Sequence, residues 1–274
     1  LHSTERNRYL KYCFAHSVRC YVSPKISDII LMGSERIHLF DTPLLVSRNM
    51  GLAVDQRAAK RVMDILISGI GIIITSPIML IIAIAVKAYD RGPVFYFQDR
   101  LTLGGKPFKI CKFRSMCVDS EKNGARLASK HDSRITPVGH VLRNLHLDEL
   151  PQLFNVFKGD MSLVGPRPER ESIMLEYEKE LPEFYYRLKV KAGLTGYAQV
   201  YGKYNTTPYD KLKLDLFYIE NYSFLLDIKL IFMTVKIFFQ KEVSEGVDDR
   251  QVNALKGSGK TPECQRIKRR NDNE

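Results

Sequence analysis

The chain has 274 residues, 45% of them hydrophobic, so it can bury a core and hold one large domain or two smaller ones. A formal net charge of +11 predicts an anionic partner, and membrane phospholipid, a nucleotide and a polyanion fit that charge equally well. The five cysteines have no CxxC spacing and the six histidines no HExxH spacing. These patterns argue against a zinc site or a disulfide framework and favour reduced thiols facing the cytosol.

The first 55 residues are predicted to be part of a domain rather than a whole one. Residues 19–22 are typical of a short strand and residues 28–32 form a second apolar run, but an isolated pair of strands is marginal in water. Because the chain begins at Leu1, we expect a fragment of a longer protein. Residues 1–55 are then the tail of an upstream domain plus a linker, with an unstructured arm as the alternative.

Residues 65–86 carry no charged side chain and are long enough to cross a bilayer as a helix, for which about 20 residues suffice. Ser76 and Pro77 lie at the midpoint, and proline removes a backbone hydrogen bond, so a bend is predicted there. Basic residues flank both ends, whereas a spanning helix usually has a positive bias on one side. These features favour a re-entrant hairpin that enters and leaves by the cytoplasmic face. An ordinary span with a proline kink is the alternative.

Residues 94–98 and 108–113 alternate as half-buried strands do, and the glycines between them predict a turn. Lys112 and Arg114 lie two residues apart on one face of the second strand, which makes them a candidate phosphate clamp. An exposed loop is predicted at residues 120–136. A helix is predicted at residues 138–147.

Asp148 and Glu149 form an acid pair just before a proline, and Arg167 stands between two prolines in residues 165–168. One carboxylate can act as a nucleophile or base, the other can hold a divalent cation, and a stiffly held guanidinium can neutralise phosphoryl oxygens. An acidic first turn of a helix is the structural alternative for the pair. The arginine between two prolines favours phosphate chemistry.

The C-terminal third is predicted to be mainly helical. Residues 172–188 form an acidic amphipathic helix interrupted at Pro182, and the glycines and tyrosines of residues 191–204 either approach a nucleotide or form a tight turn. The apolar face and two lysines of residues 209–241 are typical of a helix in the lipid headgroup layer, with core packing as the alternative. Residues 242–274 are predicted to be disordered, with attraction to anionic lipid.

Residues 57–240 resemble the monotopic phosphoglycosyl transferases that initiate bacterial polysaccharide synthesis. The resemblance depends on motifs in one order: Lys60-Arg61, Asp64, Ser76-Pro77, Lys112-Phe113-Arg114-Ser115-Met116, Leu147-Asp148-Glu149-Leu150-Pro151-Gln152-Leu153, Gly159-Asp160-Met161-Ser162-Leu163-Val164-Gly165-Pro166-Arg167-Pro168, Gly193-Leu194-Thr195-Gly196, Gln199-Val200 and Asn221-Tyr222-Ser223. Residues 22–28 resemble the end of the nucleotide-binding-like domain of long members of the family, which implies an N-terminally truncated long form.

The resemblance implies a mixed α/β (α+β), membrane-associated fold with a re-entrant helix hairpin, a small β-hairpin or sheet and amphipathic interfacial helices. Its catalytic domain is expected at residues 56–241, with the hairpin at 65–86 and a polar tail at 242–274. The implied reaction transfers a sugar 1-phosphate from a UDP-sugar to undecaprenyl phosphate and releases UMP. It is placed at the cytoplasmic face of the bacterial inner membrane, among membrane lipids.

In this family pattern Asp148 is the nucleophile that forms an aspartyl-phosphosugar intermediate. Glu149 is the ligand of Mg²⁺. Contacts to phosphate or nucleotide are implied for Lys112, Arg114, Arg143, Arg167, Arg170, Gln199 and Lys203. The family often has arginine or asparagine where this chain has Lys203 and its neighbours, and a lysine lacks the guanidinium fork.

Three other classes of protein are alternatives to this enzyme. A membrane-anchored scaffold that binds anionic lipid fits the charge and predicts no dependence on Asp148 or a metal. A polytopic CDP-alcohol-type phosphotransferase needs several spans, and the sequence has one strong apolar segment. A nucleic-acid binder fits the charge but not that segment. Glucose, galactose and an N-acetylated amino sugar all remain compatible with the sequence as the transferred sugar, and the oligomeric state stays open.

Overall fold

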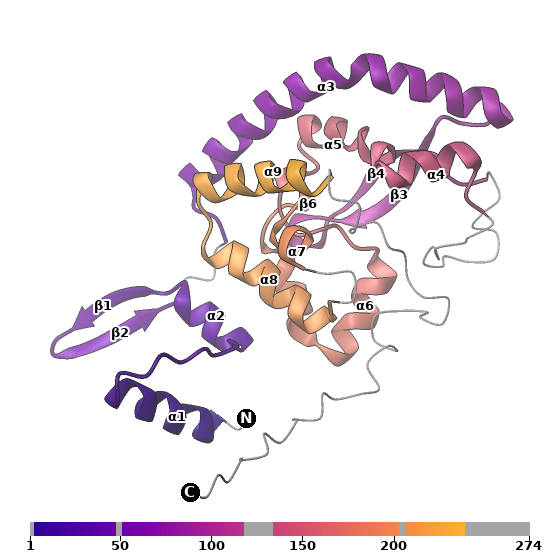
Figure 1. Cartoon of the computed structure of the whole chain (residues 1–274). Helices are drawn as coiled ribbons and strands as arrows, with labels where there is room; N and C mark the ends of the chain where they lie inside the picture. The colour runs from indigo at the N-terminus through magenta and orange to yellow at the C-terminus, as the bar shows by residue number, and fades with distance from the viewer. Residues whose placement is uncertain (1–2, 48–50, 118–133, 203–205, 239–274) are drawn as a thin grey trace, which may run out of the picture. The chain divides into compact units, whose positions relative to one another are not determined.

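A computed structural model describes residues 3–47, 51–117, 134–202 and 206–238 (Figure 1). The chain divides into two compact units, Leu1–Arg48 and Asn49–Glu274. Most of the loop predicted at residues 120–136, the residue Lys203 and the tail predicted at 242–274 lie outside the described residues.

The N-terminal unit consists of two helices and a β-hairpin: α1 (Ser3–Ala15), α2 (Ile26–Met32), β1 (Glu35–Leu39) and β2 (Thr42–Val46). An ion pair between Arg6 and Asp28 joins the two helices. The strand predicted at residues 19–22 does not form, and the apolar run at 28–32 lies in a helix. The reason is local, because the Asp28 carboxylate accepts a hydrogen bond from the amide of Lys25 (2.8 Å) and so caps the first turn of α2.

The second unit begins with α3 (Val54–Asp90), a single continuous helix that bends near its middle (Figure 1). Among the described residues it is the one helix long and apolar enough to cross a membrane. Pro77 cannot donate to the carbonyl of Ile73, and the Ser76 hydroxyl donates to that carbonyl instead (2.8 Å). The segment predicted as a re-entrant hairpin, residues 65–86, thus lies within one continuous helix that contains the predicted bend.

The remaining elements are short. In chain order they are β3 (Phe95–Leu101), η1 (Leu103–Gly105), β4 (Pro107–Phe113), α4 (Pro137–Asn144), η2 (Leu147–Glu149), α5 (Gln152–Lys158), β5 (Ser162–Val164), α6 (Glu171–Glu180), η3 (Pro182–Lys189), β6 (Gly193–Thr195), α7 (Tyr197–Tyr201), α8 (Pro208–Glu220) and α9 (Phe224–Phe238). The fold is thus a mixed one, largely helical with small sheets.

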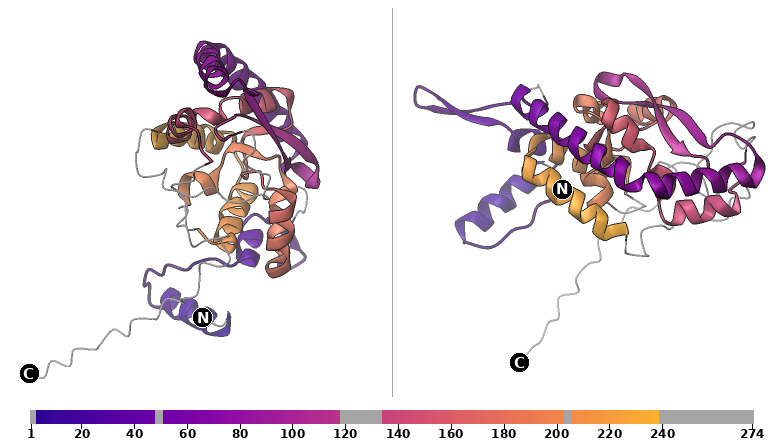
Figure 2. Two further views of the ribbon diagram at one scale, coloured as in Figure 1. Left: turned by 90° about the vertical axis from the view of Figure 1, so that its right-hand side faces the viewer. Right: turned by 90° about the horizontal axis from the view of Figure 1, so that it is seen from above.

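The predicted hairpin of residues 94–113 is confirmed, because β3 and β4 pair antiparallel from Phe95 opposite Phe113 to Leu101 opposite Pro107. The short strands β5 and β6 pair in parallel. The single helix predicted at residues 209–241 is wrong: the chain breaks it at residues 221–223 into α8 and α9. Figure 2 shows that α9 crosses close to α3 when the molecule is viewed from above.

The first half of α3 is fixed to the rest of the unit by buried charges. The Lys60 ammonium pairs with the Asp227 carboxylate of α9 (2.5 Å) and donates to the Tyr218 hydroxyl (3.1 Å). One turn further along, the Asp64 carboxylate accepts a hydrogen bond from the amide of Leu163 in β5 (3.0 Å). These contacts explain why charged residues directly precede the apolar stretch of the helix.

Helix α5 packs against the same part of α3, and two glycines of α3 lie at this contact. Gly69 and Gly71 face Phe157 and Leu153, and an added Cβ would lie 3.5 Å and 3.4 Å from those side chains. Arg61 donates to the carbonyl of Phe157 (2.8 Å), which lies at the C-terminal end of α5 where carbonyls lack helical donors.

The second half of α3 packs against β4 and α4. Met79, Ile82 and Val86 form a buried cluster with Phe113 and Leu142. At the end of the helix Asp90 forms an ion pair with Arg114, which follows β4 directly. Both halves of α3 therefore contact the same folded unit.

Replacement of Lys60 by methionine tests the first of these anchors. The Asp227 side chain is fully buried, so loss of its cation leaves an uncompensated charge, and we expect the variant to lose about 3–5 kcal/mol of unfolding free energy. The measurement is thermal unfolding in detergent. Lys229→Met, on the exposed side of α9, is the matched control and should unfold as the wild type does. Equal unfolding temperatures for the wild type and Lys60→Met would remove the pair as an anchor.

Candidate active site

The acid pair lies in a short connection between two helices. Asp148 and Glu149 occupy the 3₁₀ turn η2, and His146 before it has a φ of 52°, in the left-handed region. This conformation is uncommon for a residue with a Cβ, and it turns the chain sharply after α4. Pro151 follows and begins α5. The two carboxylates are therefore held in a constrained turn, close to but outside the first turn of a regular helix.

Two cations hold the Glu149 side chain. Its Oε1 atom accepts hydrogen bonds from the Lys112 ammonium in β4 (2.6 Å) and from the Arg167 guanidinium (2.8 Å). Burial by itself would raise the pKa of Glu149, but the charges of Arg167 and Lys112 outweigh it and hold that pKa well below its usual range. Glu149 is therefore ionised at neutral pH.

Asp148 has the opposite shift. Its side chain is buried, and burial together with the neighbouring charge of Glu149 raises its pKa, although Lys112 and Arg143 partly oppose this. A carboxylate that is poorly solvated is a better nucleophile than one exposed to water. Adjacent acids whose environments push their pKa values apart are typical of sites where the two groups have different tasks.

The structure brings some of the predicted phosphate contacts together and separates others. Lys112 and Arg167 converge on Glu149, and Arg143 lies near Asp148 with its Nε donating to the Ser115 hydroxyl (2.9 Å). Arg170 forms the N-cap of α6. The amide of Gln199 donates to the carbonyl of Leu194 (3.1 Å), which places it at the β6–α7 connection.

Arg114 does not form a clamp with Lys112. It forms an ion pair with Asp90 at the end of α3, and Gly92 makes this possible because a Cβ there would collide with the Arg114 guanidinium. The guanidinium is buried, and its Nη1 atom has no hydrogen-bond partner among the residues that the structure describes. The sequence did not point to Asp90, because nothing in the pattern of a membrane helix indicates which distant residue its end contacts.

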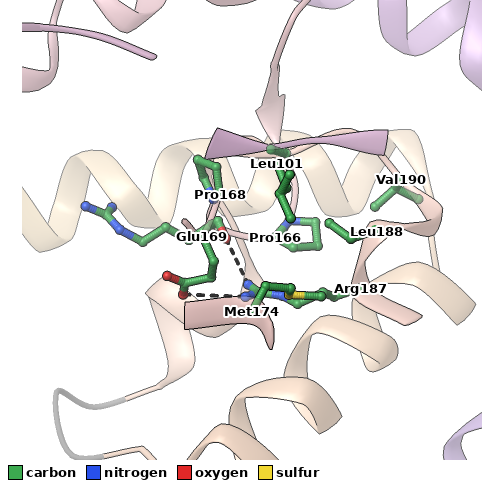
Figure 3. A pocket seen from close by; sticks show the side chains of 10 residues that line it. Leu101, Pro166, Pro168, Glu169, Met174, Arg187, Leu188 and Val190 are labelled. Atoms are coloured by element: carbon green, nitrogen blue, oxygen red, sulfur yellow. Dashed lines mark hydrogen bonds and ion pairs between the residues drawn. The ribbon is translucent and has the colours of Figure 1, made fainter. Parts of the chain in front are cut away.

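A second group of charged residues surrounds Glu169, two residues after Arg167. The sequence patterns did not indicate this group either. The Glu169 carboxylate pairs with Arg187 (3.4 Å) and with Lys211, and Figure 3 shows Arg187 reaching toward it across a small cavity. Burial opposes ionisation of Glu169, but these cations lower its pKa to about 2. The cavity has a volume of about 10 Å³, room for roughly one water molecule, so it is not a substrate pocket.

The acid pair fits a magnesium ion only as part of a shared site. Within the described ranges no three acidic, histidine or cysteine side chains lie close enough to hold a metal by themselves. Mg²⁺ is commonly held by one or two carboxylates plus substrate phosphates. Asp148 and Glu149 supply two adjacent carboxylates, so the donor set suits an ion that arrives with a diphosphate.

A scan against protein families matches residues 55–241 to the family described as bacterial sugar transferase. The chain belongs to this family. It is 39% identical over 235 residues to the UDP-N-acetylgalactosamine-undecaprenyl-phosphate N-acetylgalactosaminephosphotransferase of Aeromonas hydrophila, covering 85% of this chain and 55% of that protein. It is 43% identical over 208 residues to the UDP-glucose:undecaprenyl-phosphate glucose-1-phosphate transferase of Klebsiella pneumoniae, covering 74% and 43%.

A shorter relative, the UDP-glucose:undecaprenyl-phosphate glucose-1-phosphate transferase of Caulobacter vibrioides, is 37% identical over 229 residues. That match covers 79% of this chain and 84% of the relative. By contrast, the chain spans about half the length of the Aeromonas hydrophila and Klebsiella pneumoniae relatives.

The lowered pKa of Glu169 predicts a pH dependence of stability. A carboxyl whose pKa is lower in the folded than in the unfolded state adds stability above its unfolded pKa, and this is lost as the pH falls toward about 2. Between about pH 5 and about pH 3, the loss from this group is about 2 kcal/mol. The measurement is the unfolding free energy of the wild type and Glu169→Gln at both pH values. Equal slopes would show that Glu169 does not titrate this way.

Proposed function

We propose that this chain carries the catalytic domain of an enzyme that transfers a sugar 1-phosphate from a UDP-sugar to undecaprenyl phosphate, the first membrane step of bacterial polysaccharide synthesis. The observation that carries the proposal is the buried Asp148 beside Glu149, which Lys112 and Arg167 hold ionised. Membership of the sugar transferase family and the names of the relatives support the same reaction.

In the first step an Asp148 carboxylate oxygen attacks the β-phosphorus of the UDP-sugar. The bond from that phosphorus to the bridging oxygen breaks, and UMP leaves with the oxygen and the electron pair. In the second step an oxygen of undecaprenyl phosphate attacks the same phosphorus, and the bond to Asp148 breaks. The carboxylate is thereby restored, and the product is an undecaprenyl-diphospho-sugar.

The cations near the acid pair would balance charge on the transferred phosphoryl group. Lys112, Arg143 and Arg167 are placed for this task, and fixed charges that meet a transition state need no reorganisation during the reaction. Glu149 would hold a magnesium ion, which when bound supplies Lewis-acid neutralisation of the diphosphate, and this leaves Asp148 as the nucleophile. Arg170, Gln199 and Lys203 are proposed contacts to the rest of the nucleotide sugar.

For Arg114 we propose a structural role and not a direct contact with phosphate. Because it is buried and paired with Asp90, its charge acts on the position of the α3 end. It then reaches substrate only indirectly, through the residues that it holds in place.

The transferred sugar is not assigned. Relatives of similar identity are named for N-acetylgalactosamine and for glucose, so identity alone does not distinguish the two donors.

Helix α3 is proposed to enter the cytoplasmic leaflet of the inner membrane and return to the same side. Its first half is tied to α9 through Lys60, and its end is tied to Arg114 beside β4. A helix that crossed a bilayer would have its two ends on opposite sides of the membrane, whereas these ends contact one folded unit. Exposed apolar side chains on α3 and neighbouring helices would face lipid: Ile70, Ile73, Ile74, Leu80, Ile81, Phe154, Phe157, Phe224, Leu225 and Phe232.

Asp148→Asn tests the nucleophile. An amide cannot form the acyl phosphate, so UMP release from UDP-sugars with undecaprenyl phosphate and magnesium should fall on the order of 10³-fold or more. The unfolding temperature should stay equal or rise, because a neutral amide replaces a poorly solvated carboxylate. Asp99→Asn, at an exposed position in β3, is the matched control. Activity of Asp148→Asn near that of the wild type would remove Asp148 from the nucleophile role, whereas no UMP release from the wild type itself would favour the scaffold that binds anionic lipid.

Pro77→Ala tests the topology of α3. With alanine the amide at position 77 can donate to Ile73, so the helix is expected to straighten and carry residue 88 across the membrane. A cysteine at Ala88 is labelled with an impermeant thiol reagent in vesicles of known orientation. It should react from the cytoplasmic side in the otherwise wild-type chain and in the Ile78→Ala control, and from the opposite side in Pro77→Ala. Reaction from the opposite side in all three would mean that α3 spans the membrane.

A further inference from the structure

Each of the four successive carbonyl groups from Pro166 to Glu169 accepts a hydrogen bond. The donors are, in order, the amide of Gly193 (2.9 Å), the guanidinium of Arg187 (2.9 Å), the guanidinium of Arg100 (3.2 Å) and the amide of Leu101 (3.0 Å). Proline also fixes φ at residues 166 and 168. Every backbone carbonyl of residues 166–169 is therefore hydrogen-bonded, and the φ angle is fixed at two of these four residues.

Two of these four donors are charged side chains inside the protein. The Arg187 side chain is only 1% exposed and lies against the ring of Phe184 (4.9 Å). A buried guanidinium persists only beside counter-charges. Glu169 supplies one to both arginines, at 3.4 Å from Arg187 and 3.9 Å from Arg100, and Asp215 supplies a second to Arg187 (2.9 Å).

Lys211 completes the group from α8 by pairing with the same Glu169 carboxylate. Its side chain is 25% exposed, so it is the member nearest to solvent. Glu169 thus joins three cations from three separate elements: β3, η3 and α8.

The Arg167 side chain is fixed in a different way. It is 45% exposed, so packing does little to hold it, and its guanidinium reaches the Glu149 carboxylate at 2.8 Å. The place that the guanidinium can reach is therefore set mainly by the backbone from which it projects. A movement of residues 166–169 would carry the guanidinium away from Glu149.

We propose that Glu169, together with Arg187, Arg100 and Lys211, is a positioning network that keeps the Arg167 guanidinium on Glu149 for catalysis. The proposal rests on the proposed sugar-phosphate transfer and adds residues to it. The four side chains act on the backbone of residues 166–169 and are therefore positioning residues. Arg167 itself contacts the acid pair. Both arginines donate to carbonyls of this one segment, so the network is directed at it.

A double-mutant cycle tests whether the network acts through Arg167. Glu169→Gln and Lys211→Met are made alone and in an Arg167→Met background, and kcat for UMP release is measured on full-length protein in membranes. Displacement of a catalytic group by about 1 Å can cost ~100-fold in rate, and we expect a loss of this order for Glu169→Gln and a smaller loss for Lys211→Met. In the Arg167→Met background each substitution should cost less than about twofold, because contacts that act through one residue are not additive.

Losses of the same factor in both backgrounds would overturn the proposal, because a network that only stabilises the fold lowers activity whether or not Arg167 is present. Glu171→Gln, an exposed acid at the start of α6, is the matched control and should leave kcat unchanged in either background. Lys211→Met keeps the Glu169–Arg187 pair, so it serves if Glu169→Gln does not fold.

Hydrogen exchange gives a readout that needs no turnover. The amides of Leu101 and Gly193 donate to the Glu169 and Pro166 carbonyls, and in Lys211→Met both should exchange at least about tenfold faster than in the wild type. The amide of Cys111 in β4, which donates to the side-chain oxygen of Asn155 in α5, should be unchanged. Unchanged exchange at Leu101 and Gly193 would overturn the network. If the wild type releases no UMP, the proposed function fails, and exchange still decides whether the network holds this segment.

Discussion

The Glu149 carboxylate is the contact on which the arrangement of the site depends. One of its oxygens accepts hydrogen bonds from β4 through Lys112 and from residues 165–168 through Arg167. A largely buried carboxylate requires such partners, so two elements remote in sequence converge on one short turn. Burial and the neighbouring charge of Glu149 raise the pKa of Asp148, which stays the less acidic member of the pair. A single ion-pair arrangement thus produces both the geometry and the difference in acidity.

The second constraint comes from α3, whose two halves are attached by different means. Buried ion pairs fix the first half, and an apolar cluster with a terminal ion pair fixes the second. The Asp90–Arg114 pair is followed directly by Ser115, which accepts from Arg143 near the acid pair. A displacement of the helix end would therefore be transmitted to the site within a few residues. This connection gives a physical route by which the long apolar helix and the turn that carries the acid pair affect one another.

Local patterns predicted the parts of the molecule whose cause is local. The alternation in residues 94–113, the uncharged stretch at 65–86 and the acid pair before Pro151 all depend on neighbouring residues. Asp28 can cap a helix, but the apolar composition of residues 28–32 favoured a strand-like interpretation. The α8–α9 break has no glycine or proline at residues 221–223, and its one local signal is Ser223, whose hydroxyl accepts a hydrogen bond from the amide of Leu226 (3.1 Å) and so caps α9. The partners of Arg114 and Glu169 come from distant segments, and no periodicity identifies which buried charges will meet.

The net charge also does not say which charged residues are buried, whereas the structure shows this. The excess of +11 predicts an anionic partner but does not say which of the basic side chains face solvent, and several of them are buried in ion pairs. Lys60 neutralises Asp227, and Arg187 is almost fully buried between Glu169 and Asp215. Arg167, nearly half exposed, keeps a guanidinium edge that a phosphate can approach. Phosphoryl transfer depends on charges that are both accessible and fixed, and these properties conflict for a single side chain in water. Here an exposed arginine is carried by a backbone that buried arginines hold, so the two requirements are met by different residues.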